Sequence, residues 1–143
     1  MSMLKFVVKN ESEMIELGEK LAGALSLPCV IEMVGDVGVG KTTLVKGLAR
    51  GMGVEEEVTS PSFVVNKRYE AGGAVLTHYD FYRLEDPGLM MEELGEMVDD
   101  DRAVTVVEWA ESVRGVLGED RVRVKIFYNK DEGRVVEIEG VEL

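Results

Sequence analysis

A glycine-rich stretch in the first third of the chain carries residue types that bind phosphate groups. Residues 35–42 read Gly-Asp-Val-Gly-Val-Gly-Lys-Thr and fit the Walker A pattern G-x-x-x-x-G-K-T. Glycines let the backbone approach a phosphate, and loop amides with a helix N-terminus direct donors at the anion. In such a loop the lysine reaches the β- and γ-phosphates and the threonine hydroxyl binds Mg²⁺. We therefore expect a nucleotide-binding segment made of Asp36, Val37, Gly38, Val39, Gly40, Lys41, Thr42 and Thr43.

The segments on either side of this loop have the character needed to hold it. Residues 29–34 form a short apolar run of the strand type, and residues 43–50 place Leu44, Val45 and Leu48 at helical spacing. Strand, glycine loop and helix in this order are the context in which a Walker A loop is believable. An ordinary glycine-rich turn, which is the alternative interpretation, would not need a strand before it and a helix after it.

Two acidic residues are candidates for the chemistry that a phosphate loop alone cannot perform. Nucleotide hydrolysis needs an acidic group near the Mg²⁺ and a positioned water molecule. Asp80 ends the expected strand 74–79, and Glu108 ends the apolar strand 103–107. Either carboxylate can support the metal while the other orients the water. Lys41, Asp80 and Glu108 are thus the candidate catalytic residues, with Thr42, Glu108 and Asp80 as candidate metal ligands.

A hydroxyl-rich segment follows the helix of the phosphate loop. Thr59, Ser60 and Ser62 surround Pro61, at the place where many nucleotide hydrolases have a mobile segment that senses the γ-phosphate. A plain polar turn explains the same residues equally well.

Three further residues have both a functional and a structural interpretation. His78 shares one side of an extended segment with Asp80, although a lone histidine is more often structural than catalytic. Trp109 either packs in the core or lies over the nucleotide site, and its place beside Glu108 favours the site. Arg83 either reaches a phosphate or pairs with a surface carboxylate.

The remaining pattern predicts an α/β fold of the P-loop NTPase type. The mixed, mostly parallel central sheet has helices on both faces, in a single domain spanning residues 1–143. The expected strands are 4–9, 29–34, 63–69, 74–80, 103–107, 121–128 and 134–139. Expected helices span 10–25, 43–51 or 43–53, a segment capped by Asp86 that ends near Asp99, and 111–117.

Composition restricts the partners and the compartment. The formal net charge is −12, which argues against unassisted binding of nucleic acid, because such binding depends on lysine and arginine. A single cysteine, Cys29, and the lack of a signal-peptide pattern lead us to expect a cytoplasmic protein. No apolar run approaches the roughly 18 residues of a membrane span, so no membrane partner is expected.

Four motifs in register resemble the TsaE (YjeE) family. They are the loop at residues 35–43, Val-Thr-Ser-Pro-Ser-Phe at 58–63, His-Tyr-Asp-Phe-Tyr-Arg-Leu at 78–84, and Glu-Trp at 108–109. The match covers nearly the whole chain, including Glu-Leu-Gly at 16–18. Ser62 stands where the family usually has threonine. Because the sequence stops soon after the last expected strand, we expect no longer C-terminal tail of the kind that some members have.

This resemblance implies an ATPase that acts with the TsaB and TsaD proteins in threonylcarbamoyladenosine (t⁶A) modification of tRNA at position 37. It implies ATP and Mg²⁺ as cofactors, Thr42 and Glu108 as the magnesium ligands, and Asp80 as support for the metal or the water. The segment Thr59–Ser62 resembles a switch region. Glu11 and Arg134 are the nearest matches to the residues expected beside the nucleotide base. The protein would contact tRNA only through the complex and would not itself transfer the threonylcarbamoyl group.

Two other functions share the same phosphate loop. A small nucleoside or nucleotide kinase would add an arginine-rich lid, and no arginine cluster follows the loop. A nucleotide-gated binding module with negligible turnover would use ATP only to set its docking state. No guanine-reading N-K-x-D motif is present, which favours ATP over GTP.

Overall fold

A seven-stranded mixed sheet forms the centre of the molecule. The computed structural model describes residues 3–36, 38–61, 66–81, 88–130 and 132–143. Within them the strand order is β1-β7-β6-β2-β5-β4-β3. Parallel pairing runs from β6 through β2 and β5 to β4, and both edges are antiparallel. The strands are β1 Leu4–Val8, β2 Cys29–Val34, β3 Asn66–Ala71, β4 Ala74–Asp80, β5 Ala103–Glu108, β6 Val122–Tyr128 and β7 Arg134–Glu139.

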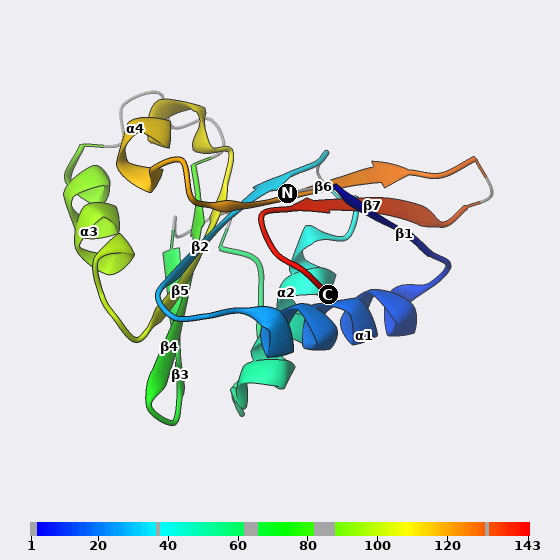
Figure 1. The fold of residues 1–143 in the computed structure, drawn as a ribbon, viewed down its shortest axis with the longest axis horizontal. Coiled ribbons are helices and arrows are strands. Elements are labelled where there is room, and N and C mark those ends of the chain that lie inside the picture. The colour runs from blue at the N-terminus through cyan, green and yellow to red at the C-terminus, as the bar shows by residue number, and fades with distance from the viewer. Residues whose placement is uncertain (1–2, 37, 62–65, 82–87, 131) are drawn as a thin grey trace.

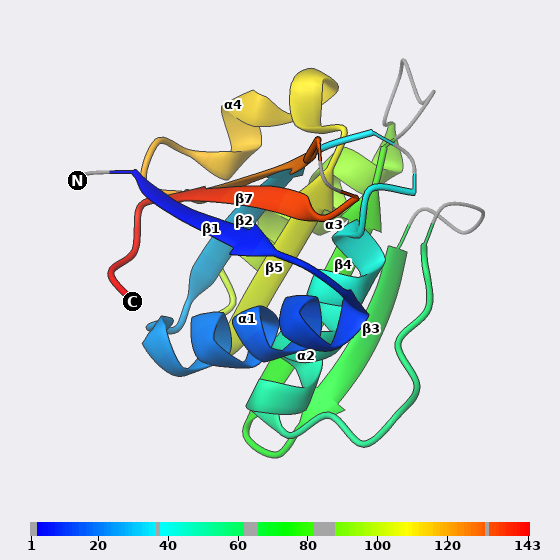
Figure 2. The ribbon, with the colours of Figure 1, turned by 90° about the vertical axis from the view of Figure 1, so that its right-hand side faces the viewer.

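Helices cover both faces of this sheet, as Figures 1 and 2 show. On one face lie α1 (Glu11–Ala24) and α2 (Lys41–Met52). On the other lie α3 (Leu89–Val98), the short 3₁₀ turn η1 (Ala110–Ser112) and α4 (Arg114–Leu117). The predicted α/β fold, with a mixed sheet between helices, is confirmed.

Strand β5 illustrates how the sheet is buried on both faces. Its side chains alternate: Val104 and Val106 pack in the core beneath α1 and α2, whereas Ala103 and Val107 pack beneath α3 and α4. All six residues of β5 are buried. A continuous apolar run is what a central parallel strand requires, because neither face meets water.

Close contact between α1 and α2 depends on two glycines. A Cβ atom on Gly47 would lie 2.1 Å from the carbonyl oxygen of Ile15, and one on Gly18 would lie 2.4 Å from that of Leu44. Asn10 caps α1 by accepting a hydrogen bond from the Glu13 amide at 2.9 Å. Helix α1 therefore lies directly on α2, whose N-terminus ends the phosphate loop.

The ends of several elements differ slightly from the sequence prediction. Helix α2 passes through Gly51 and is capped by Gly53, which has the left-handed φ of 93° that ends a helix well. Helix α3 begins at Leu89 with Gly88 at its N-cap position, while the predicted cap Asp86 lies outside the described residues. The described part of the chain contains no helix that is long and apolar enough to span a membrane.

Candidate active site

The phosphate loop connects the C-terminal end of β2 to the N-terminus of α2. Gly38 and Gly40 have φ values of 82° and 120°, in a region that residues with side chains rarely adopt. The Leu44 amide donates to the Gly40 carbonyl oxygen at 3.0 Å and so begins α2 directly after the loop. The earlier amides of this helix have no partner within it, which makes its N-terminus suited to an anion. Val37 lies outside the described residues.

Lys41 is a buried cation held by three groups. Its ammonium donates to the Gly35 carbonyl oxygen at 2.7 Å and lies 3.2 Å from Oε1 of Glu108. The same Nζ atom lies 4.9 Å from the ring centroid of Trp109. The structure thus brings the predicted lysine, acid and tryptophan together around one charge.

Glu108 lies at the centre of this cluster. Its second oxygen, Oε2, is hydrogen-bonded to Nε2 of His78, and both side chains are buried. Burial alone would raise the pKa of Glu108, but the His78 hydrogen bond and the nearby charge of Lys41 outweigh it. The pKa is therefore below its usual value, and the carboxylate is ionised at neutral pH.

His78 has features of both the structural and the functional interpretation that its sequence position left open. It is fully buried in β4, as a structural histidine would be, and it also contacts the candidate acid. Nδ1 has no hydrogen-bond partner within the described part of the chain. The ring therefore makes its hydrogen bond on the side facing Glu108.

The second acid, Asp80, lies beside Glu108 at the same edge of the sheet. The two residues are register partners in the parallel pair β4–β5, and Asp80 is also buried. Thr42 lies in the first turn of α2, one residue after Lys41. These oxygen donors suit Mg²⁺, which is usually bound by one or two carboxylates together with phosphates and water. Among the described residues, no group of three or more histidine, cysteine, aspartate or glutamate side chains is placed to hold a metal ion.

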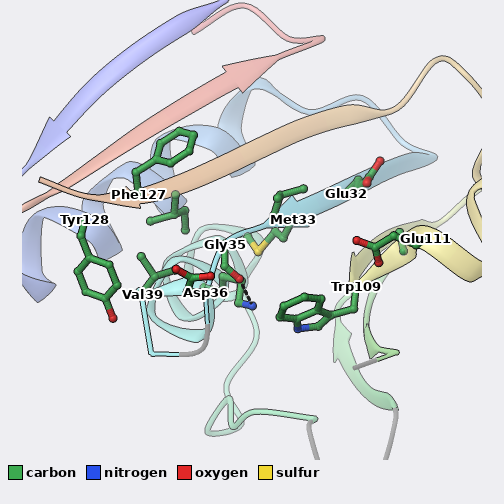
Figure 3. Close-up of a pocket in the computed structure, with 13 residues that line it drawn as sticks. Glu32, Met33, Gly35, Asp36, Val39, Trp109, Glu111, Phe127 and Tyr128 are labelled. Carbon is green, nitrogen blue, oxygen red and sulfur yellow. Dashed lines mark hydrogen bonds between the residues drawn. The ribbon is translucent and has the colours of Figure 1, made fainter. Parts of the chain in front are cut away.

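A cavity of about 450 Å³ opens on the Lys41 side of the loop. In Figure 3, Trp109 and Tyr128 lie on either side of Gly35 and Asp36, and the side chain of Phe127 points to the opposite side of β6 from that of Tyr128. This loop-side cavity is lined by Glu32, Met33, Val34, Gly35, Asp36, Val39, Lys41, Trp109, Ala110, Glu111, Ile126, Phe127 and Tyr128. Trp109 borders this cavity beside Lys41, and it also packs against the buried cluster beneath α3 and α4. Its position over a nucleotide stays a prediction.

A second cavity, of about 240 Å³, lies on the other side of the loop. Glu11 and Arg134 both line it, together with loop residues Gly38 and Gly40 and with Thr43 of α2. Arg134 donates from Nε to the Val39 carbonyl oxygen at 2.8 Å and lies over the ring of Tyr128. The two residues suggested only by the family resemblance therefore meet the phosphate loop from β7 and α1.

The hydroxyl segment is described only in part. The Thr59 amide donates to the Tyr69 hydroxyl at 3.3 Å, and the Thr59 hydroxyl is hydrogen-bonded to the Lys67 ammonium. Both contacts are with β3. Ser60 is exposed. Ser62 and Arg83 lie outside the described residues, and the switch role stays a prediction.

Several residues around the site were not predicted. Phe127 and Tyr128 end β6, and they border the loop because β6 pairs with β2, from which the loop emerges. Glu32 sits within the apolar run before the loop. Its acidic side chain was a visible signal, but its partners are far away in the sequence.

Known proteins resemble this chain over most of its length. A family model described as threonylcarbamoyl adenosine biosynthesis protein TsaE matches residues 8–136. A Streptomyces coelicolor protein named tRNA threonylcarbamoyladenosine biosynthesis protein TsaE is 40% identical, with 90% of each chain covered. The Bacillus subtilis protein of the same name is 35% identical over 99% of this chain and 88% of its own. The crystal structure of Bacillus subtilis YdiB superimposes with a TM-score of 0.79 and 27% identity, covering 96% of this chain and 84% of that one.

Proposed function

Because this chain belongs to the TsaE family, and thus to the proteins of tRNA t⁶A biosynthesis, we propose that it binds and hydrolyses ATP in that pathway. In this role it acts with the TsaB and TsaD proteins and does not itself transfer the threonylcarbamoyl group. Its net charge of −12 supports contact with tRNA through the protein complex rather than directly.

The observation that carries this proposal is the contact between Lys41 and Glu108. A buried lysine at the end of a glycine loop lies 3.2 Å from a buried carboxylate on the adjacent parallel strand, with Asp80 next to it. A site that only bound phosphate would not need two buried acids at the edge of the sheet beside the loop. Hydrolysis uses such groups, because an acid holds the metal and a polar side chain positions the water.

Each residue has a defined part in this proposal. The loop amides and the N-terminus of α2 bind the phosphates, and Lys41 donates to the β- and γ-phosphate oxygens. Thr42 and Glu108 would hold Mg²⁺, with Asp80 supporting the metal or orienting the water. When bound, the metal neutralises charge that develops on the transferred phosphoryl group. Glu11 and Arg134 line the cavity that takes the nucleoside.

Reconstitution of t⁶A synthesis tests the pathway role directly. TsaB, TsaD and tRNA are incubated with threonine, bicarbonate, ATP and the enzyme that forms threonylcarbamoyl-adenylate from the last three, with or without this protein. We expect sustained t⁶A formation only when this protein is present. Equal t⁶A yield without this protein, or with its Lys41→Ala variant, would contradict the role.

A second assay separates hydrolysis from the two alternative functions. Labelled ATP is incubated with this protein, alone or with TsaB and TsaD, and the products are resolved by thin-layer chromatography. Release of inorganic phosphate is expected, and it should accelerate with the partners. Label on an added nucleoside would indicate a kinase. A slow rate that the partners leave unchanged would indicate a nucleotide-gated binding module.

A further inference from the structure

We propose that Arg114 and Glu32 are positioning residues that hold the segment carrying Glu108 and Trp109 against the strand of the phosphate loop. This inference rests on the proposed function, because the geometry that it maintains is that of the ATP site. Neither residue touches the predicted reacting groups. Their effect would pass through the backbone on either side of Trp109.

The contacts form a closed cluster of three side chains. Arg114 donates to Oε2 of Glu32 from Nε at 3.1 Å and from Nη2 at 2.9 Å. Arg121 donates from Nε to Oε1 at 2.6 Å. The Glu32 side chain is 3% exposed, so both of its oxygens are bound away from solvent. A carboxylate bound in this way fixes both arginines more strictly than a surface pair would.

The cluster joins strand β2, which leads into the phosphate loop, to helix α4, which follows Glu108 and Trp109 in the chain. Glu32 lies in β2, three residues before Gly35 begins the loop. Arg114 begins α4, five residues after Trp109. Glu32, Lys41 and Trp109 also line the same loop-side cavity. A displacement of α4 from β2 would therefore be transmitted to the acid and the tryptophan at the lysine.

The backbone at Trp109 explains why this segment needs an anchor. Trp109 has φ 55° and ψ 54°, a left-handed conformation that is unfavourable for a bulky side chain. Such a conformation persists only when the chain on both sides is held. Strand β5 holds the preceding side. On the following side Ala110, Val113 and Leu117 are buried beneath the sheet, and Arg114 is bound to Glu32.

Buried ion clusters are frequently no more stabilising than apolar residues of the same size. Stability alone is therefore a weak explanation for placing Glu32 in an otherwise apolar strand. The two hydrogen bonds from Arg114 to Oε2 of Glu32, by contrast, specify where α4 lies along β2. In Arg114→Met the Glu32 carboxylate keeps its pairing with Arg121, so we expect the main effect of this variant at the site and a smaller effect on overall folding.

Trp109 is the only tryptophan of the sequence, so its fluorescence reports on this segment with or without any ATPase activity. We would compare the wild type with Arg114→Met, which keeps the aliphatic length of a half-exposed side chain and removes the contact. Glu32→Gln is a second variant that removes the charge but keeps an acceptor. Arg50→Met serves as the control. It breaks the exposed pair between Arg50, near the C-terminal end of α2, and Glu19 of α1.

In Arg114→Met we expect red-shifted Trp109 emission, greater quenching by acrylamide, and roughly a tenfold lower kcat/KM for ATP. Arg114→Lys should recover part of both effects, and Arg50→Met should change neither. Unchanged emission and quenching in Arg114→Met, with native circular dichroism, would overturn the inference. If fluorescence responds but no variant or wild type hydrolyses ATP, the anchor stands and the proposed function fails.

Discussion

The ammonium of Lys41 lies 3.2 Å from Oε1 of Glu108, and together they join the phosphate loop to strand β5. Lys41 also donates to the Gly35 carbonyl oxygen, so its charge is already shared between the loop and the acid. A phosphate that enters the loop adds a second anionic partner to this lysine. Nucleotide binding and the environment of Glu108 are therefore linked through a single side chain.

Lys41→Ala should nearly abolish ATP turnover. The variant removes the donor to the phosphates, and loss of one such donor costs about 10²–10³-fold in kcat in other enzymes. Phosphate release and nucleotide binding by calorimetry measure the loss. Lys46→Ala on the same helix is the matched control, because Lys46 borders a different hollow, beside Glu55–Val58. Wild-type turnover in Lys41→Ala would refute the assignment of the phosphate loop.

Glu108→Ala should impair hydrolysis more than Asp80→Ala. Glu108 contacts Lys41 directly, whereas Asp80 is its neighbour in the register of β4 and β5. We expect kcat to fall about 10²-fold in Glu108→Ala, with ATP binding partly kept and a higher Mg²⁺ requirement. Titration of Mg²⁺ at saturating ATP measures both effects. Should Asp80→Ala be the more damaging of the two, the roles of these acids are reversed.

His78→Ala should lower turnover without removing any group that touches ATP. The histidine binds Oε2 of Glu108, and loss of such supporting partners typically costs about 10–100-fold in activity or metal affinity. His78→Gln, whose amide can donate, should recover part of the activity. Thr77→Val is the control, since Thr77 is buried on the opposite face of β4. Equal activity in His78→Ala and the wild type would leave the histidine a purely structural role.

Much of this site could be predicted because its signals are local. The glycine loop, the strand before it and the acids that end two strands are each defined by adjacent residues. The sequence thus indicated Lys41, Asp80 and Glu108 before their contacts were known. Which acid meets the lysine was left open, because strand order and register depend on residues far apart in the chain.

The unpredicted parts of the site are those that depend on long-range contacts. Glu32 binds arginines 82 and 89 residues away, and no local pattern links them. Tyr128 reaches the loop only because β6 pairs with β2. Glu11 and Arg134 had no sharp motif of their own, yet both line the smaller cavity beside the loop.

Arg134→Ala should weaken ATP binding more than it lowers kcat. Arg134 donates to the Val39 carbonyl oxygen and lines the cavity that we assign to the nucleoside. Asp80 and Glu108 do not line this cavity. Loss of one charge-assisted hydrogen bond corresponds to roughly a tenfold higher Kd. Calorimetry with ATP measures Kd, and Lys130→Ala on the same hairpin is the control. A large fall in kcat at unchanged Kd would instead place Arg134 at the reacting phosphate.

The contribution of Glu32 to stability should disappear at acidic pH. Burial alone would raise the pKa of Glu32, but hydrogen bonds from Arg121 and Arg114 and their charges lower it below its usual value. A carboxyl with a lowered folded-state pKa stabilises the fold above its unfolded pKa, about 4.3, and loses this contribution as the pH falls through the folded value. Urea unfolding of the wild type and Glu32→Gln measures the difference between pH 7 and pH 3. We expect the wild type to be more stable at pH 7 and this advantage to shrink below about pH 4. An advantage that stays constant down to pH 3 would show that the charge of Glu32 does not stabilise the cluster.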